Sequence, residues 1–346
     1  MKALLKSGDG SPGLQLSEMP VPVPAAGEVL VRVLRAGICD TDLHIEAWDD
    51  WARSRTRTPR IAGHEFVGVV EAAPPGGPAA GTLVSGERHV ACDRCRACRS
   101  GQRHLCPRTE RLGMDRDGVF AEYVTLPAQN LWAHPSGTDL DTAVLFDSLG
   151  NAVQAVTSFP VMGKDVLVTG AGPIGLMAAA LARHLGARRV VVTETDPYRR
   201  KLAHVLGAHH VIDPRERPLR ETAAGLGIED GFACAVEASG HPEAIRDALA
   251  HLLPGGQVAA LGIATGPVEI DWSTAVLRMT GIRGIHGHRI FDTWRMVSAL
   301  LAGGLDPTPV ITHHFPYEDH EAAFAAARKG PSGKVLLDWS TPCASR

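Results

Sequence analysis

The stretch VLVTGAGPIGLMAAA, residues 166–180, joins an apolar run to an alanine-rich segment through a glycine turn. A continuous apolar run is typical of a strand buried in a parallel sheet, and the alanine-rich segment favours a helix. Gly170, Gly172 and Gly175 fit the pattern G-x-G-x-x-G, in which the glycines permit a tight turn, close approach of a pyrophosphate and close packing of the helix. The first turn of that helix presents free N–H groups to phosphates. The stretch therefore predicts a dinucleotide-binding βαβ unit.

The sequence around the turn strengthens this prediction, because the glycine pattern alone is a weak signal. A second apolar run, RVVVTE, ends at Glu194, 19 residues after Gly175. An acidic side chain at that place binds the ribose hydroxyls of the adenosine half and repels a ribose phosphate, which favours NAD over NADP. Arg199 lies five residues further on and weakens that preference, since a nearby arginine can accommodate the phosphate. Pro173 and Ile174, inside the glycine pattern, are expected to contact the cofactor as well.

The pattern of apolar and polar residues changes near residue 148. Before it, short apolar runs such as EVLVRVLRAGIC and GHEFVGVVEAA alternate with Pro, Gly and charged residues, which predicts a β-rich domain. After it, apolar runs such as FACAVEAS and QVAALGIA alternate with helical stretches, which predicts a doubly wound parallel sheet. A helix, FDTWRMVSALLAGG, then leads to a terminal strand, KVLLDW, that could return to the first domain. We expect an α/β protein of two domains, in keeping with a length of 346 residues.

The composition excludes several classes of function. No apolar run approaches the roughly 18 to 20 residues that a membrane helix needs. The apolar stretch near the first residue is too short for a signal peptide. The formal net charge of -3 gives no basic field for nucleic acid. We therefore expect a cytoplasmic protein that acts on a small molecule, without a membrane or nucleic-acid partner.

A basic loop, CDRCRACRSGQRHLC, contains four of the seven cysteines at Cys92, Cys95, Cys98 and Cys106. An odd cysteine count and a reducing compartment argue against disulfides. Two short gaps and one longer gap let four thiolates converge on one tetrahedral zinc ion, and the interspersed arginines offset its charge of about -2. An iron-sulfur cluster is the main alternative, although its spacing fits less well, and unligated or redox thiols are another. Because a four-cysteine site leaves no open position, the loop predicts a structural zinc.

A third group of residues combines GICDTDLH with a following GHE. Cys39, His64 and Glu65 bring a thiol, an imidazole and a carboxylate into one short stretch, and three protein ligands with one open position are typical of catalytic zinc. Each residue also has an ordinary interpretation. A lone cysteine is usually a small buried apolar residue, and most of the 16 histidines should lie on the surface or in the core. The spacing alone leaves both interpretations open.

Taken together, these segments resemble the zinc-dependent medium-chain dehydrogenases along nearly the whole chain. The resemblance is carried by GICDTDLH, GHEFVGVV, the four-cysteine loop, FDSLGNAVQA, VLVTGAGPIGLMAAA, ALGIATGPVEIDWS and GIHGHRIFDTWRMVSALLAGGLD. It implies a GroES-like catalytic domain over residues 1–147 and 290–346, with a structural zinc lobe at about 88–108, and a Rossmann NAD-binding domain over residues 148–289. It also implies a homotetramer built through the nucleotide-binding sheets.

The resemblance implies roles for residues of the first domain. Cys39, His64 and Glu65 match catalytic zinc ligands, and Asp147 falls where the family places a further ligand, so that Glu65 and Asp147 can alternate. The four loop cysteines match the structural zinc site one for one.

Further roles concern the proton and the cofactor. Thr41 and His44 match a relay from hydroxyl to imidazole that removes the proton, and His89 matches a substrate-pocket residue. The segments expected on the nicotinamide side contain Leu261, Gly262, Ile263, Ile285 and His286.

The most discriminating segments resemble enzymes that oxidise the 3-hydroxyl of L-threonine with NAD, giving 2-amino-3-oxobutanoate and NADH. Three departures from that pattern affect the expected substrate: Asp40 replaces a glycine, Gln154 a histidine and His286 a tyrosine. The alternatives are an enzyme for another β-hydroxy amino acid and a polyol dehydrogenase of the sorbitol type. A catalytically silent NAD-binding or zinc-lobe protein is disfavoured, because the predicted ligands and relay are all present.

Overall fold

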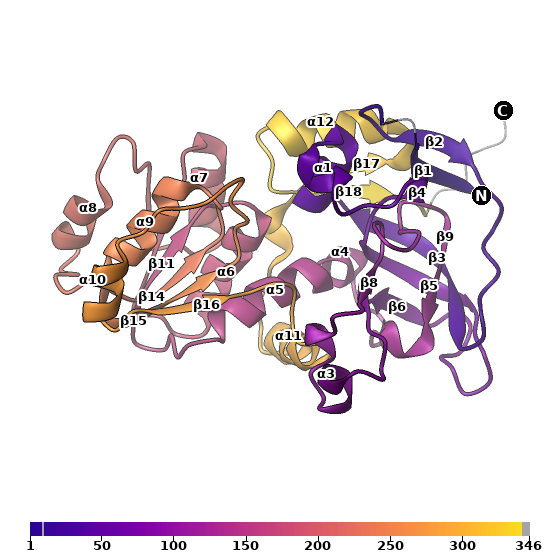
Figure 1. The fold of residues 1–346 in the computed structure, drawn as a ribbon, viewed down its shortest axis with the longest axis horizontal. Coiled ribbons are helices and arrows are strands. Elements are labelled where there is room, and N and C mark those ends of the chain that lie inside the picture. The colour runs from indigo at the N-terminus through magenta and orange to yellow at the C-terminus, as the bar shows by residue number, and fades with distance from the viewer. Residues whose placement is uncertain (9, 341–346) are drawn as a thin grey trace. The chain divides into compact units, whose positions relative to one another are not determined.

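Contacts within the chain separate it into two units, seen in the computed structural model of Figure 1, which describes residues 1–8 and 10–340. Unit 1 contains Met1–Asp147, Arg289–Phe291 and the residues from Ile311 onward, and unit 2 contains Ser148–His288 and Asp292–Val310. Among the described residues, none of the helices combines the length and apolar character that a membrane span requires.

The main sheet of unit 1 is built around β3 (Glu28–Gly37), whose alternating residues Val29, Val31 and Val33 are completely buried. Alternation of this kind is what a strand with one buried face requires. The strand order is β10-β6-β5-β3-β18-β17, and β9 also pairs with β3. The other strands are β5 (Glu65–Ala72), β6 (Leu83–Gly86), β9 (Tyr123–Pro127), β10 (Leu131–Ala133), β17 (Ile311–Pro316) and β18 (Lys334–Asp338). The terminal strand therefore does return to the first unit, antiparallel to β3.

Smaller elements complete unit 1. A three-stranded sheet contains β1 (Lys2–Lys6), β2 (Gln15–Glu18) and β4 (Arg60–Ile61), and a two-stranded ribbon contains β7 (His89–Val90) and β8 (Glu110–Arg111). The helices are α1 (Asp40–Ala47), α2 (Asp50–Arg53), α3 (Arg96–Arg99), α4 (Leu140–Val144) and α12 (His320–Lys329), with 3-10 turns η1 (Arg103–Leu105), η2 (Ala128–Asn130) and η4 (Tyr317–Asp319). Helix α5 (Phe146–Val156) begins in unit 1 and continues in unit 2.

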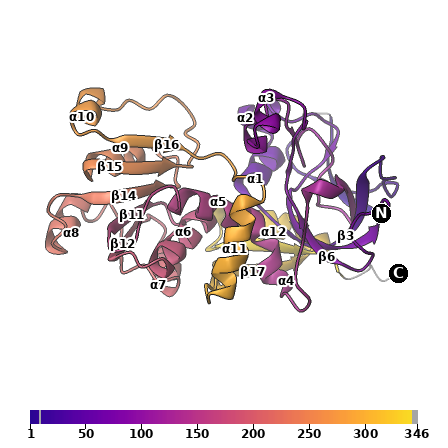
Figure 2. The same ribbon diagram turned by 90° about the horizontal axis from the view of Figure 1, so that it is seen from below.

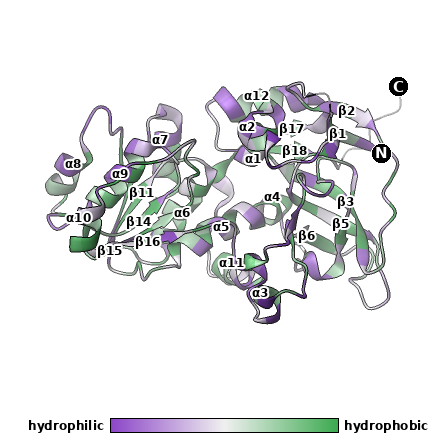
Figure 3. Cartoon of the chain, viewed as in Figure 1, coloured by the Kyte–Doolittle hydropathy of each residue, from purple (hydrophilic) through white to green (hydrophobic). Residues whose placement is uncertain are grey.

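Unit 2 contains a six-stranded parallel sheet in the order β13-β12-β11-β14-β15-β16. Figure 2 shows the strands from β12 to β16 side by side. The strands are β11 (Asp165–Thr169), β12 (Arg189–Thr193), β13 (His210–Ile212), β14 (Phe232–Glu237), β15 (Leu252–Ala260) and β16 (Gly281–Gly284). Every residue of β11 is buried, and Figure 3 shows the hydrophobic colour along the central strands. This is the doubly wound sheet that the continuous apolar runs predict.

Helices connect successive strands of this sheet. They are α6 (Pro173–His184), α7 (Pro197–Val205), α8 (Leu219–Gly225), α9 (Pro242–Ala250) and α10 (Trp272–Leu277). After β16, the last strand of the sheet, come α11 (Asp292–Ala302) and the turn η3 (Thr308–Val310).

The second boundary between the units differs from the sequence prediction. Residues 292–310 belong to unit 2, whereas the sequence analysis placed everything from residue 290 in the first domain. The completely buried Trp294 of α11 stacks on His288 with ring centroids 5.4 Å apart, and η3 contacts α6 and α7. These contacts hold the segment in unit 2 before the chain returns to unit 1.

Candidate functional site

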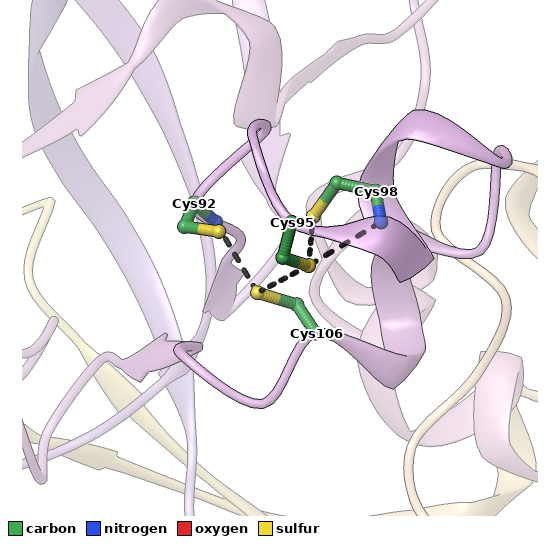
Figure 4. A group of neighbouring side chains, drawn as sticks. All are labelled: Cys92, Cys95, Cys98 and Cys106. Carbon is green, nitrogen blue, oxygen red and sulfur yellow. Dashed lines mark hydrogen bonds between the residues drawn. The ribbon is translucent and has the colours of Figure 1, made fainter.

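The four loop cysteines form a compact cluster in unit 1, with their sulfur atoms turned toward one another (Figure 4). The Sγ of Cys95 lies 3.5 Å from that of Cys98 and 3.8 Å from that of Cys106. Sulfur atoms at the corners of a zinc tetrahedron, each about 2.3 Å from the ion, lie about 3.8 Å apart. The donor set and its spacing therefore fit one structural zinc ion.

Backbone N–H groups of the zinc lobe donate hydrogen bonds to these sulfur atoms. The N–H groups of Cys92 and Cys98 donate to Cys106 Sγ at 3.4 Å and to Cys95 Sγ at 3.5 Å. A hydrogen bond from the backbone of Arg94 is the largest influence that lowers the pKa of Cys92, to about 6, while burial beside other thiols raises the pKa of Cys98. One thiol of the cluster thus loses its proton easily, whereas a neighbouring thiol keeps its proton. A bound cation would stabilise the thiolate form of all four cysteines.

A second cluster is created by the pairing of β3 with β5. Their register places Gly37 opposite Glu65, so Cys39, just beyond the end of β3, comes close to His64, just before β5. Ligand atoms of Cys39, His64 and Glu65 lie within 4.8 Å of one another. Gly37 is required here, because a Cβ at that position would lie 2.6 Å from Oε2 of Glu65.

Asp147, at the start of α5, has the properties of a further ligand. Its side chain is 3% exposed, and neither carboxylate oxygen has a hydrogen-bond partner among the described residues. A buried carboxylate without partners is costly unless a cation satisfies it. Its negative charge also contributes to raising the pKa of the buried Glu65, for which burial is the largest cause. Asp147 therefore belongs to the same electrostatic cluster as Glu65.

The imidazole of His64 is held by Asp42, a residue that the sequence analysis did not single out. The completely buried Asp42 lies 3.4 Å from Nδ1 of His64 through Oδ1, and its Oδ2 accepts a hydrogen bond from the Cys39 N–H at 2.9 Å. Nε2 of His64 is buried and has no hydrogen-bond partner in the described part of the chain. Burial is the largest single influence and lowers the pKa of His64, but the charge of Asp42 and hydrogen bonds with Asp42 and Cys39 together outweigh it and raise the pKa to about 10. A carboxylate on one imidazole nitrogen and a free second nitrogen are typical of a metal ligand.

Glu65 is directed toward Lys334 of β18. The two side chains form an ion pair in which the residues are 1% and 2% exposed. The sequence analysis missed Lys334, since the signal for it is only a lysine at the start of a terminal strand. Within the described residues, Nε2 of His64 and both carboxylate oxygens of Asp147 are thus predicted ligand atoms that have neither a hydrogen bond nor an ion pair as close as that of Glu65 with Lys334.

The predicted relay residues lie on α1, which starts directly after Cys39. Thr41 and His44 are three positions apart, so they share one face of the helix. Nδ1 of the half-buried His44 lies 2.5 Å from Oδ2 of Asp49. Asp40 is exposed, so its extra carboxylate points to solvent.

His89 is the buried first residue of β7, shortly before the cysteine loop. Its Nδ1 lies 2.7 Å from Oε1 of Glu87, and burial followed by the charge of Arg88 lowers the pKa of the imidazole. The charge of Asp147 acts in the opposite direction on the pKa of His89, which indicates that His89 lies near enough to the second cluster to be affected by its charge.

The glycine turn of unit 2 has the predicted geometry. Gly170 follows β11 with φ of +87°, and Gly172 caps α6 with Pro173 in its first turn. A Cβ on Gly175 would lie 2.0 Å from the carbonyl oxygen of Gly170, so only glycine allows this close packing. Ile174 lies in the same first turn, whose N–H groups can receive phosphates.

Glu194 follows β12 and reaches the turn. Its Oε2 accepts a hydrogen bond from Ala171 N at 2.7 Å, and its Oε1 accepts from Thr195 N at 2.7 Å and Asp196 N at 2.8 Å. Arg199 is half-buried at the start of α7, where its N–H donates to Asp196. The carboxylate is thus held beside the glycine turn, and its contact with the adenosine ribose stays a prediction.

The predicted nicotinamide-side residues follow the carboxyl ends of two parallel strands. Leu261, Gly262 and Ile263 come after β15, and Ile285 and His286 after β16. Ligands bind at this edge in open parallel sheets. Sequence analysis missed Glu237 at the end of neighbouring β14, which is 1% exposed and accepts hydrogen bonds from the N–H groups of Ser239 and Gly240.

Comparison with known proteins agrees with these two units. Residues 25–136 match the alcohol dehydrogenase GroES-like domain, and residues 173–303 match the zinc-binding dehydrogenase domain. The chain therefore belongs to the zinc-binding alcohol dehydrogenase family. This confirms the expected class of enzyme and the GroES-like and Rossmann fold.

Individual relatives are similar along the whole chain. The L-threonine 3-dehydrogenase of Solibacter usitatus is 49% identical over 343 residues, covering 98% of this chain and 100% of the relative. That of Streptomyces coelicolor is also 49% identical, over 344 residues, with 98% and 100% covered. Among solved structures, an Escherichia coli CFT073 alcohol dehydrogenase complexed with NADH has a TM-score of 0.89 at 29% identity, covering 98% of this chain and 99% of that one. The alcohol dehydrogenase of Thermus sp. ATN1 has a TM-score of 0.88 at 28% identity, with the same coverage.

Proposed function

We propose that this chain oxidises the 3-hydroxyl of L-threonine with NAD, giving 2-amino-3-oxobutanoate and NADH. The observation that carries the proposal is the second cluster of unit 1, where ligand atoms of Cys39, His64 and Glu65 lie within 4.8 Å of one another. The buried carboxylate of Asp147, which belongs to the same electrostatic cluster, has no hydrogen-bond partner among the described residues. Relatives at 45–50% identity over nearly the whole chain carry the name of this activity. The alternatives are another β-hydroxy amino acid and a polyol.

Two zinc ions are part of the proposal. Cys92, Cys95, Cys98 and Cys106 would hold the structural ion. Cys39, His64 and Asp147 would hold the catalytic one, with Glu65 able to replace or join Asp147 if it leaves Lys334. Zinc bound there would act as a Lewis acid that lowers the pKa of a substrate hydroxyl.

The proton released from that hydroxyl needs a route to solvent, and Thr41 and His44 supply it. Asp49 accepts the hydrogen on Nδ1 of His44, which leaves the lone pair on Nε2 to take a proton. The hydroxyl group of Thr41 can pass the proton from the substrate to His44, because a hydroxyl both donates and accepts hydrogen bonds. Loss of this proton and transfer of the C3 hydride to the nicotinamide convert the C–O single bond into a carbonyl.

The oxidant is NAD, bound by unit 2. The glycine turn would receive the pyrophosphate, and Glu194 would exchange its bond to Ala171 N for the ribose hydroxyls. The remaining cofactor contacts would come from Arg199 and from the residues after β15 and β16.

A substrate panel tests the proposal. Zinc-loaded protein with NAD is assayed for NADH absorbance with L-threonine, L-serine, other β-hydroxy amino acids, sorbitol and simple alcohols. We expect L-threonine to have the highest kcat/KM. A higher value for another amino acid or for sorbitol would keep the chemistry and replace the substrate, and silence across the panel in protein that binds zinc and NAD would refute the proposal.

We further propose a cytoplasmic homotetramer. The edge strand β16 and the neighbouring α10 expose Ile282, Trp272 and Leu277, with 50%, 69% and 82% of each residue accessible. An exposed edge strand beside apolar side chains favours association with another copy. Light scattering after size-exclusion chromatography gives the mass, and a monomer at micromolar concentration would refute this part.

A further inference from the structure

Arg88 is a cation beside the second cluster that the reaction described above does not use. It lies between β6 and β7, directly before His89. Among the charged groups that raise the pKa of Arg88, Asp147 has the largest effect, and Cys39, Glu87 and Glu65 follow in that order. It also acts on the imidazoles of His64 and His89, whose pKa values it lowers. A group that influences all of these residues must lie among them.

The backbone around Arg88 is fixed from two sides. Nδ2 of the buried Asn130 donates to the carbonyl oxygens of Glu87 and His89, at 2.9 Å and 3.0 Å. Leu112 N donates to the carbonyl oxygen of Arg88 itself at 3.1 Å. The side chain therefore starts from a rigid position, as a specificity residue should.

One donor of the guanidinium lacks a hydrogen-bond partner in the described part of the chain. Nε of Arg88 is buried and has no hydrogen-bond partner among the described residues, although the residue as a whole is half-buried. Burial opposes its charge, but the surrounding carboxylates and thiol raise its pKa, so it stays a cation. A buried donor without a partner is costly, so a bound ligand that brings an acceptor would be favoured here, and a charged acceptor most of all.

We infer that Arg88 binds the carboxylate of the substrate. The inference rests on the proposed function, since the carboxylate of a β-hydroxy amino acid lies only two bonds from the carbon that loses hydride. A carboxylate matches the planar fork of a guanidinium in two parallel hydrogen bonds. Arg88 would thus select amino-acid substrates against polyols, which have no carboxylate.

Arg88 could instead act only as a counter-ion for Asp147. The two roles differ in what they recognise: a counter-ion affects every substrate equally, whereas a carboxylate-binding residue affects only substrates that carry the carboxylate. A pair of ligands that differ at this group separates them. L-threonine and L-threoninamide share the hydroxyl and the ammonium group, and only the first is anionic at the end that Arg88 would hold.

The experiment compares Arg88→Gln with the wild-type holoenzyme and with Arg53→Gln. Arg53 is an exposed arginine of α2 that forms an ion pair with the exposed Asp50, so this control makes the same chemical change elsewhere. We expect Arg88→Gln to lower kcat/KM for L-threonine about tenfold to a hundredfold, the loss typical of a charged hydrogen bond. The value for L-threoninamide should change less than about twofold. Equal losses for both ligands, or no loss for either, would overturn the inference.

Calorimetric titration of both ligands into the zinc-loaded enzyme with NADH gives a readout that does not need turnover, with zinc content measured alongside. Wild type should bind L-threonine more tightly than the amide, and Arg88→Gln should remove the preference while keeping its zinc. If binding shows this pattern but L-threonine is not oxidised, the proposed substrate is wrong and the role of Arg88 stands. If the wild type has no preference, the role of Arg88 is wrong whatever the turnover.

Discussion

Lys334 lies against Oε2 of Glu65, and both side chains are at least 98% buried. The pairing follows from the registers of two strands with β3, because Leu336 of β18 and Glu65 of β5 both lie opposite Gly37. Burial raises the pKa of Glu65, and the Lys334 ammonium group is the largest influence that opposes this rise. Each charge therefore depends on the other in an interior that would otherwise exclude both.

Replacing Lys334 with methionine should destabilise the protein. The change leaves Glu65 as an unpaired buried carboxylate, which costs about 3–5 kcal/mol of unfolding free energy. Urea unfolding of metal-free and zinc-loaded protein measures it, and we expect the smaller loss with zinc, since a second cation then lies near the carboxylate. The double variant Lys334→Met with Glu65→Gln should recover most of the loss. A single variant within about 1 kcal/mol of wild type would show that the pair contributes little to stability.

Local motifs of this chain could be predicted and distant partners could not. The glycine turn and the cysteine loop have donors a few residues apart, so spacing alone constrains their geometry. Lys334 and Asp42 bear on the same site, but their roles depend on strand register and on burial. No local pattern separates Lys334 from a surface lysine at the start of a strand. Asp42 resembles an ordinary first-turn helix acid, which is favoured there for its interaction with the helix dipole. Arg88 was missed for the same reason.

Replacing Cys39 with serine should remove one zinc ion and leave the other. The two clusters are separate groups of side chains, so zinc content should fall from two ions per chain to one. Turnover should fall by at least about a thousandfold, because the substrate hydroxyl loses its Lewis acid. Metal analysis and steady-state kinetics check this, with NAD binding expected to stay unchanged. Cys234→Ser is the control, as Cys234 is a buried cysteine of β14 outside both clusters. Retention of two ions by Cys39→Ser would exclude Cys39 as a required ligand.

Replacing His44 with glutamine should slow the reaction without weakening cofactor binding. The variant loses the imidazole that takes the proton, and such groups typically contribute about a hundredfold to ten-thousandfold. Activity should recover partly at higher pH, where solvent accepts the proton more readily. Kinetics as a function of pH measure both effects, and Asp50→Asn on the exposed face of α2 controls for a change of charge nearby. A variant with wild-type kcat across the pH range would rule out the relay.

Replacing Glu194 with glutamine should narrow the preference for NAD over NADP. The carboxylate repels a ribose phosphate and accepts hydrogen bonds from ribose hydroxyls, whereas the amide does neither as well. We expect KM for NAD to rise about tenfold and KM for NADP to fall. Glu216→Gln, a change of an exposed acid of unit 2, is the control. Unchanged constants for both cofactors would place the ribose away from Glu194.

His134 should make the protein less stable in mild acid. Its Nε2 lies 2.8 Å from Oγ of Ser85, which itself donates to the carbonyl oxygen of Ala143, so Nε2 carries the hydrogen. Nδ1 is buried and has no partner among the described residues, so a proton added there would find no acceptor. Burial accordingly lowers the pKa of His134 to about 4. Because the pKa is about 6.5 in the unfolded chain, the stabilisation is complete above that pH and is lost as the pH falls toward 4.

The loss attributable to this histidine between pH 7 and pH 5 should be about 2 kcal/mol. His134→Gln keeps a hydrogen-bond donor near Ser85 but cannot take up a proton. Urea unfolding of both proteins at the two pH values isolates the effect, because every other titrating group is common to them. The variant should therefore lose about 2 kcal/mol less than the wild type over this interval. Equal losses in the two proteins would mean that His134 can be protonated in the folded state at no extra cost, which would contradict a buried Nδ1 without an acceptor.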